Sequence, residues 1–251
     1  MNDVSIERVD HHIAVVCLHR PPNNFFDTPL LTALADAYEE LAAADDCRAI
    51  VLRSEGRHFC AGLDFATNKG QDIAALYHNA LRLFAAPLPV VAAVGGSAIG
   101  GGLGLALSAD FRIATPMSRF SANFSRLGFH HGFGLTVTLP RAVGEQHAAE
   151  LLYSGRRVGG TEALAVGLCD ELVDEEEGLL PAALAFAGSI TSSGPLAVRS
   201  IRATLRQGLV ERLRLAMDHE CDVQESLRHS SDFAEGIVAS AERREPRFTG
   251  T

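Results

Sequence analysis

The chain has 251 residues, 47% hydrophobic and 21% charged, which suits a compact apolar core and excludes disordered, collagen-like and coiled-coil classes. The formal net charge is −9 and no long basic tract occurs, so we expect no nucleic-acid partner. Five widely spaced cysteines without a C-x-x-C pair argue against disulfides and a metal site, and predict a cytoplasmic location.

The first predicted element is a hairpin within residues 4–20, where two apolar runs flank a polar turn. A helix beginning at Pro29 follows, capped by Asp27 or Thr28, because apolar residues recur there at the helical period. The next expected elements are strand 48–54, helix 72–84, strand 89–96, a glycine turn, a helix ending near Ala109 and strand 111–115. This alternation predicts βαβ units with right-handed crossovers.

Beyond about residue 135 the pattern is mainly helical. We expect helices near 145–153, 161–167, 178–190 and 195–228, and a last helix capped by Ser231 or Asp232. The late arginines recur at helical spacing and are interpreted as one exposed face; they are Arg199, Arg202, Arg206, Arg212 and Arg214. The chain is therefore divided into an α/β core over residues 1–190 and a helical C-terminal region over residues 191–251.

An uncharged stretch between Arg82 and Asp110 is long enough to cross a membrane. It contains two prolines and six glycines, however, which favour a buried strand, a tight turn and a closely packed helix. We therefore expect no membrane association.

Two glycine-bearing turns carry the main functional signal: HFCAGLD at residues 58–64 and GGSAIGGGLGLALSAD at residues 95–110. Each follows a predicted buried strand. The triplet at 100–102 removes side chains where a strand becomes a helix, so a ligand can approach the amides at the helix N-terminus. Two converging amides would form an oxyanion hole. The alternative is that the glycines serve only close strand-to-helix packing.

Three other glycine-containing motifs do not match the sequence. The nucleophile elbow fails because Ile99 stands where its last glycine belongs. The Walker pattern fails because Gly70 and Gln71 follow Lys69, and the dinucleotide-binding pattern fails at Leu107.

Six segments follow one another in the order RPPNNFFD, GRHFCAGLD, PVVAAVGGSAIGGGLGLALSADFRIAT, LPRAVG, YSGRRVGGTEALAVGLCDELV and SDFAEGIVASAERREPRFTG. Together they cover nearly the whole chain, and their order and separations resemble the enoyl-CoA hydratase/isomerase family, the crotonase superfamily. The resemblance implies an α/β spiral of repeated ββα units with a helical C-terminal trimerisation region. It also implies acyl-CoA thioester substrates, assembly as a homotrimer or a dimer of trimers, and no cofactor beyond the coenzyme A of the substrate.

By this resemblance, the backbone amides of Leu63 and Gly101 would bind the thioester oxygen when it becomes negatively charged. A ligand with several negative charges needs a basic lining in an acidic protein, so basic residues near the first turn could meet the coenzyme A phosphates; they are Arg53, Arg57, His58 and Lys69. The alternative is that they belong to a solvated loop. The acyl-CoA-binding residues so expected are Ala61, Gly62, Leu63, Lys69, Gly100 and Gly101.

The chain departs from the family at three positions where relatives carry catalytic acids. Family hydratases have one glutamate two residues beyond the glycine triplet and a second in a later loop, and these positions are Gly104 and Phe124 here. An acid found in some other members corresponds to Gly132. Neither glycine nor phenylalanine can transfer a proton, so the usual pair of glutamates is absent.

Three titratable residues could replace these acids. His130 and His131 lie in the loop LGFHHGFG and titrate near neutral pH, with His131 preferred as acid or base; alternatively, both are polar loop residues. Asp64 directly follows the expected oxyanion donor and could transfer protons from an apolar pocket, although an aspartate there can also cap a turn. A nucleophilic role for Cys60 is a further, weaker alternative.

We therefore predict an acyl-CoA-processing lyase or isomerase of this family that stabilises a thioester oxyanion through Leu63 and Gly101. One alternative is hydrolysis of a coenzyme A thioester or a carbon–carbon bond with His131 or His130. The other is an acyl-CoA-binding protein without catalysis.

Overall fold

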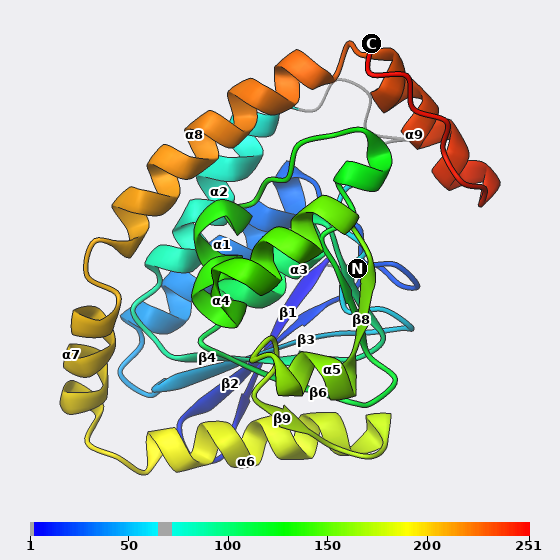
Figure 1. Cartoon of the computed structure of the whole chain (residues 1–251). Coiled ribbons are helices and arrows are strands. Elements are labelled where there is room, and N and C mark those ends of the chain that lie inside the picture. Colours follow the sequence, from blue (N-terminus) through cyan, green and yellow to red (C-terminus); the bar gives the residue numbers. More distant parts are fainter. Residues whose placement is uncertain (1–2, 65–71) are drawn as a thin grey trace.

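The computed structural model describes residues 3–64 and 72–251, and its main sheet has the strand order β1-β2-β3-β4-β6-β9 (Figure 1). The strands are β1 (Val4–Val9), β2 (Ile13–Leu18), β3 (Ala49–Ser54), β4 (Val90–Val94), β6 (Phe111–Ala114) and β9 (Glu171–Leu172). Strands β1 and β2 form the predicted antiparallel hairpin, and every later pair is parallel. The parallel crossovers expected from the sequence are confirmed.

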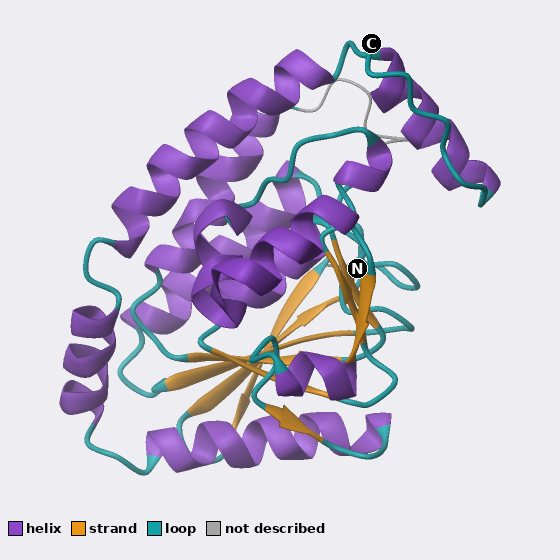
Figure 2. Cartoon of the chain, viewed as in Figure 1, coloured by secondary structure: helices purple, strands orange, loops and turns teal. Residues whose placement is uncertain are grey.

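Helices cover both faces of this sheet (Figure 2). Helices α1 (Thr28–Ala43), α2 (Ile73–Ala85) and α3 (Gly101–Ser108) lie on one face and α6 (Leu179–Thr191) lies on the other. Successive strand residues point to opposite faces, so neighbours such as Ile50 and Val51 enter different apolar clusters. Because both faces are buried, the central strands are apolar along nearly their whole length.

A second, three-stranded sheet was not predicted. It contains β5 (Ser97–Ile99), β7 (Arg119–Ser121) and β8 (Arg157–Gly159), in that order. We expected a glycine turn directly after the strand at 89–96, and the structure instead has strand β5 there. Strands of three residues are too short to show an alternating apolar pattern, so only long-range pairing reveals them.

The helical boundaries after residue 130 also differ from the prediction. Helix α4 (Leu135–Ser154) begins well before residue 145, because a proline and a kinked glycine inside it, Pro140 and Gly144, resemble helix breakers in the sequence. The single helix expected over 195–228 is two helices, α7 (Pro195–Leu205) and α8 (Leu209–Leu227), separated at Gly208, whose φ is +71°. Residues 160–165 form α5 (Gly160–Ala165).

Helix α9 (Ser231–Glu242) is capped one residue earlier than expected. The Ser230 hydroxyl accepts a hydrogen bond from Phe233 N–H at 3.0 Å, so neither Ser231 nor Asp232 is the cap. Helix α8 runs along the outside of α2, and α9 projects from the body of the molecule beside the single-turn helix η1 (Ser125–Leu127) (Figure 1). Residues of these two C-terminal helices meet the loops that follow β3, β5 and β7.

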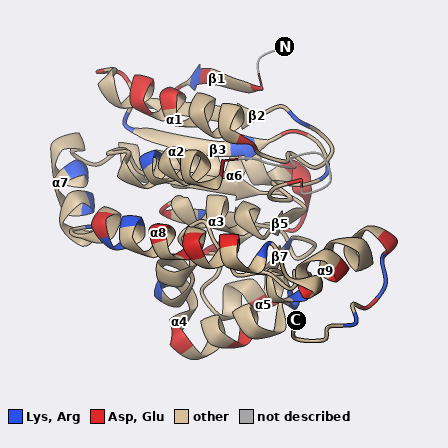
Figure 3. Ribbon diagram, turned by 90° about the horizontal axis from the view of Figure 1, so that it is seen from above, with Lys and Arg blue, Asp and Glu red and all other residues tan. Residues whose placement is uncertain are grey.

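The arginines of α7 and α8 do not form one exposed face. Arg202 Nε and Arg206 Nε lie 2.9 and 3.0 Å from the carboxylate oxygens of Asp110, which are mostly buried. Burial lowers the pKa of Arg206 to about 10. Further along α8 the expectation holds, because Arg214 pairs with Glu211 and both signs of charge occur along this helix (Figure 3). Asp110 thus fastens the end of α7 to the core.

No single helix among residues 3–64 and 72–251 is both long and apolar enough to cross a bilayer; a bent pair, Glu176–Thr191 with Pro195–Leu205, passes on length and composition alone. The uncharged stretch between Arg82 and Asp110 contains β4, β5 and α3 of the core. Its glycines serve the strand-to-helix turn as predicted.

Candidate active site

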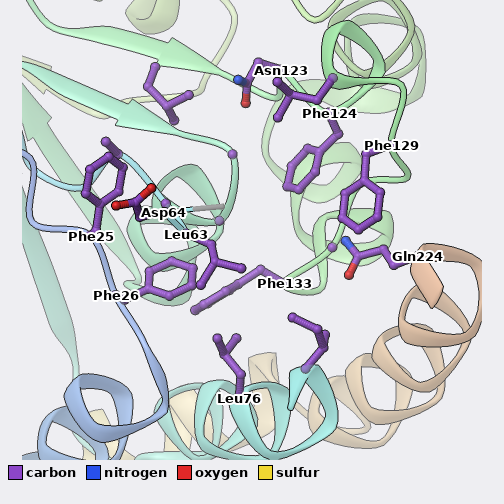
Figure 4. Close-up of a pocket in the computed structure, with 18 of the residues that line it drawn as sticks. Phe25, Phe26, Leu63, Asp64, Leu76, Asn123, Phe124, Phe129, Phe133 and Gln224 are labelled. Carbon is purple, nitrogen blue, oxygen red and sulfur yellow. The ribbon is translucent and has the colours of Figure 1, made fainter. Parts of the chain in front are cut away.

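A cavity of about 340 Å³ lies where the loops after β3, β5 and β7 meet helices α2, α8 and α9. Figure 4 shows Phe124 and Phe129 on one side of this space and Phe26, Leu63 and Phe133 on the other. A concave, mostly apolar cavity with a few polar groups is typical of small-molecule sites. Five predicted acyl-CoA-binding residues line it, namely Ala61, Gly62, Leu63, Gly100 and Gly101.

The two glycine-bearing turns meet at this cavity because the first lies alongside β5. Cys60 N–H donates to Ser97 O, and Ile99 N–H donates to Cys60 O, both at 3.0 Å. A Cβ on Gly102 would lie 2.0 Å from Cys60 O, and a Cβ on Gly62, whose φ is +85°, would lie 3.4 Å from Gly101 N. Only glycine allows the two backbones to approach this closely.

The amides of Leu63 and Gly101 differ from their neighbours in their hydrogen bonding. Neighbouring amides are occupied: Gly62 N–H donates to the Cys60 sulfur at 3.4 Å, and Gly100 N–H donates to Ser121 O at 2.8 Å. Within the described part of the chain, no acceptor is bonded to Leu63 N–H or Gly101 N–H. Gly101 is also the first residue of α3, where unpaired N–H groups attract negative charge.

An aromatic ring occupies the space that a side chain at position 104 would need. A Cβ on Gly104 would lie 2.6 Å from Phe133 Cβ and 2.7 Å from Phe133 Cδ1. Phe133 is buried, with a φ of +62°, between Gly132 and Gly134. The ring of Phe124 lines the same cavity. Of the two positions at which the resemblance places glutamates, Gly104 is thus covered by the ring of Phe133, and position 124 is itself a phenylalanine.

A tyrosine hydroxyl fills the space beside Gly132 in the same way. A Cβ on Gly132 would lie 1.7 Å from Tyr77 Oη, so no larger residue fits there. The Tyr77 hydroxyl donates to Gln224 Oε1 at 2.9 Å, and Gln224 Nε2 donates to His130 O at 2.9 Å. Burial, followed by the charge of Glu220, raises the pKa of Tyr77 well above its usual value, so the phenol is neutral.

Asp64 lines the cavity and is the only carboxylate among its described lining residues. It directly follows Leu63 on the loop after β3, and Figure 4 places its carboxylate beside Phe25. The other polar side chains at the wall are neutral and include Asn123, Gln224 and Ser240. Asp64 is therefore the one acidic side chain at the cavity wall in the described chain.

His130 and His131 do not line the cavity. They belong to a polar group behind it, here named the histidine–glutamate cluster, which consists of His130, His131, Thr136, His219 and Glu220. The two imidazoles stack with ring centroids 4.1 Å apart. His131 Nε2 lies 2.9 Å from Thr136 Oγ1, and the Thr136 hydroxyl donates to Glu220 Oε1 at 2.6 Å.

Glu220 anchors this cluster. It is fully buried on α8 and accepts hydrogen bonds from Gly134 N–H at 2.8 Å and Thr136 N–H at 3.0 Å. Burial raises the pKa of Glu220, although these hydrogen bonds oppose the shift. Burial, with the neighbouring His130 and His219, lowers the pKa of His131 to about 4. His131 is therefore neutral at neutral pH and holds the start of α4 rather than facing the cavity.

A sequence model of the enoyl-CoA hydratase/isomerase family matches residues 8–251. The chain belongs to this family. A probable enoyl-CoA hydratase of Bacillus subtilis is 32% identical over 258 residues, which cover 100% of both chains. A crotonyl-CoA hydratase of Syntrophomonas wolfei is 34% identical over 248 residues, 95% of each. The crystal structure of an enoyl-CoA hydratase/isomerase from Pseudoalteromonas atlantica aligns with a TM-score of 0.88 at 28% identity, covering 99% of this chain and 100% of that one.

Membership of the enoyl-CoA hydratase/isomerase family confirms the predicted crotonase-like α/β fold. One further predicted residue can now be placed, and another cannot. Cys60 is fully buried, and burial raises the pKa of its thiol to about 12, which excludes a thiolate nucleophile at neutral pH. Lys69, expected to meet the coenzyme A phosphates, lies outside the described residues.

The sequence alone did not predict that Phe133, Tyr77 or Glu220 lie at or beside the cavity. For Glu220 a signal was present, because it falls on the same helical face as Leu213, Met217 and Gln224, all of which are buried. An acidic residue on the apolar face of a helix indicates a buried polar partner. Phe133 and Tyr77 gave no comparable signal, because an aromatic residue near a glycine is ordinary core sequence.

Proposed function

We propose that this chain is an acyl-CoA-processing enzyme that stabilises a thioester-derived oxyanion with the amides of Leu63 and Gly101. The observation that carries the proposal is that two strand-to-loop turns bring these residues together at one apolar cavity. A thioester carbonyl gains negative charge in both enolate and tetrahedral intermediates. Loss of one such donor typically costs about 3–4 kcal/mol of transition-state stabilisation.

Asp64 is the group we propose for proton transfer. It lines the cavity and adjoins the Leu63 donor along the chain. Because the positions of the usual glutamates are Gly104 and Phe124, the reaction is proposed to differ from two-carboxylate hydration and to be an isomerisation or another step that needs a single acid or base.

The hydrolase alternative depends on His131 or His130. Hydrolysis of a thioester or carbon–carbon bond would need an imidazole within reach of the acyl group, directly or through one water molecule. The position of both rings outside the cavity wall gives this alternative no support.

A second candidate function is acyl-CoA binding without turnover. The observation that favours it is that Phe133 covers Gly104 and that position 124 is a phenylalanine, which leaves one carboxylate among the described lining residues. This protein would keep the two amide donors and the apolar cavity, and Asp64 would then only bind or cap.

The deciding experiment incubates the purified protein with crotonyl-CoA and a small panel of acyl-CoAs. Products are separated by liquid chromatography, which resolves isomers of equal mass, and their mass and the free coenzyme A are followed together. Isomerised or hydrated thioester far above the rate without protein supports the enzyme proposal. Free coenzyme A as the only product supports the hydrolase. Acyl-CoA affinity by calorimetry without any product supports the binding protein.

The role of Asp64 is tested by Asp64→Asn, which keeps the shape of the side chain and removes its charge. We expect turnover to fall by about a hundredfold or more while acyl-CoA affinity changes by less than about threefold. Asp45→Asn is the matched control, because Asp45 is exposed on the loop after α1. His131→Asn is measured in parallel, and a similar loss of turnover with retained affinity would assign proton transfer to His131 instead.

We also propose a homotrimer or a dimer of trimers, in the cytoplasm, with no cofactor besides the coenzyme A of the substrate. Support for assembly comes from α7, whose Leu196, Ile201 and Leu205 are 82%, 59% and 68% exposed. Light scattering coupled to size exclusion tests the assembly. A monomeric mass at micromolar concentration would contradict it.

A further inference from the structure

Six aromatic side chains line the cavity among the described residues. They are Phe25, Phe26, Tyr77, Phe124, Phe129 and Phe133. They come from four separate parts of the chain: the loop before α1, helix α2, the loop after β7 and the loop before α4. The close-up labels the five phenylalanines and shows Phe124 and Phe129 across the space from Phe26 and Phe133 (Figure 4).

Two of these rings pack against Gly101, whose amide is proposed to bind the thioester oxygen. A Cβ on Gly101 would lie 2.4 Å from Phe26 Cζ and 3.6 Å from Phe133 Cδ2. The centroids of Phe26 and Phe133 are 5.4 Å apart, with the planes inclined at 48°. A Cβ on the adjoining Gly100 would lie 3.7 Å from Phe124 Cζ. The carbon atoms next to a carbonyl bound at Gly101 would therefore enter a space bounded by ring faces and edges.

These rings are held in place before any ligand binds. Phe133 is 1% exposed and also contacts Phe84, with centroids 6.4 Å apart in an edge-to-face arrangement. The absence of a side chain at Gly104 leaves room for this position of Phe133. Phe26 is 3% exposed and is tied by its backbone to the first glycine-bearing turn, because Phe26 N–H donates to Gly62 O at 3.0 Å. Rings fixed in this way bind a flat group with little loss of conformational entropy.

The size and polarity of the cavity match a short, ring-bearing acyl group. A volume of about 340 Å³ is near the lower end of the usual range for small-molecule sites. The polar groups of the wall belong to a few residues, such as Asp64 and Asn123. Aromatic pairs gain edge and face contacts that a saturated ring of the same size does not make.

We propose that the acyl group of the substrate carries an aromatic ring or another flat conjugated system close to the thioester carbonyl. Phe26, Phe124 and Phe133 are the specificity-determining residues. This inference depends on the proposed function, because it takes the thioester oxygen to bind at Leu63 and Gly101. It assigns a role to Phe133, which covers Gly104, and to Phe124: their rings select the acyl group by its shape and π system.

The test compares phenylacetyl-CoA with cyclohexylacetyl-CoA by titration calorimetry on the full chain. The two thioesters have the same carbon skeleton and length, and only the first has a flat π system. We expect phenylacetyl-CoA to bind about tenfold more tightly. In Phe133→Leu this preference should fall to about threefold or less, because one flanking ring is lost.

Phe186→Leu is the matched control, because Phe186 lies on α6 in the other apolar cluster and should leave the preference unchanged. If Phe133→Leu does not fold, Phe124→Leu removes a ring from the cavity wall and replaces it as the test. Equal affinities, or tighter binding of the cyclohexyl compound, with both thioesters binding more tightly than free coenzyme A, overturn the aromatic preference and leave the proposed function standing. If crotonyl-CoA alone binds more tightly than free coenzyme A, only the aromatic preference is overturned. Failure of crotonyl-CoA and of both ring-bearing thioesters to bind more tightly than free coenzyme A overturns both proposals.

Discussion

Neighbouring residues of the loop at 129–134 face two different environments. Phe129, Gly132 and Phe133 line the apolar cavity, whereas His130 and His131 belong to the histidine–glutamate cluster behind it. A loop that turns its polar and apolar side chains to opposite sides keeps ionisable groups out of the cavity and still satisfies a buried carboxylate. Adjacency to cavity residues in the sequence therefore did not bring the histidines into the site.

We expect the largest effect from Glu220→Leu, which removes the buried carboxylate of the histidine–glutamate cluster. The change leaves the amides of Gly134 and Thr136 and the Thr136 hydroxyl without their acceptor. We expect the free energy of unfolding to fall by about 3–5 kcal/mol, measured by urea denaturation. Glu211→Leu on the exposed face of the same helix should cost less than about 0.5 kcal/mol. Equal losses for the two variants would mean that the cluster does not hold the loop.

The pH dependence of the free energy of unfolding tests the same cluster through His131. The pKa of His131 is lowered to about 4 in the folded chain from an ordinary value of 6.5, so the unfolded chain binds more protons between these two pH values. Stability should therefore fall as the pH drops from about 6.5 to about 4, with a contribution from His131 on the order of 2–3 kcal/mol. His131→Asn should lose less stability over this interval in urea denaturation. Parallel profiles for the two proteins would contradict the assignment.

At the cavity, Gly104→Ala tests how closely the Phe133 side chain packs against helix α3. The new methyl would meet Phe133 Cβ at 2.6 Å, and we expect a loss of about 1–3 kcal/mol together with weaker acyl-CoA binding, measured by denaturation and calorimetry. Gly188→Ala in α6 is the control, since nothing lies within 4 Å of its added Cβ, and it should stabilise the chain by about 0.5–1 kcal/mol. A stabilising Gly104→Ala would show that Phe133 moves aside freely.

The smallest effect is expected at the boundary between the two environments, where Tyr77 faces the cavity and bonds to Gln224. Tyr77→Phe removes the hydrogen bond to Gln224 Oε1 and should cost about 1 kcal/mol in thermal or urea unfolding. Acyl-CoA affinity should change little, because the ring remains in the wall. A large loss of turnover with unchanged stability would instead give the Tyr77 hydroxyl a part in proton transfer.

Local chemistry determined much of this fold. Helix α1 begins where Asp27 accepts a hydrogen bond from Leu30 N–H at 2.9 Å, and the central strands follow from short apolar runs. The two glycine-bearing turns were predictable because glycine alone permits the close backbone approach seen at Gly62 and Gly102. Helix capping, the periodicity of apolar side chains and steric limits on the backbone act over a few residues. They can therefore be predicted directly from the sequence.

Only the tertiary structure decided which side chains face the cavity. The hydrogen bond from Tyr77 to Gln224 joins residues 147 positions apart, and that from Gly134 to Glu220 joins residues 86 apart. Such contacts between distant parts of the chain place Tyr77 beside Gly132. They also place His130 and His131 outside the cavity wall. The short strands of the second sheet likewise exist through pairing with distant segments. The sequence by itself therefore determined the elements and the two turns, and long-range packing decided the wall around them.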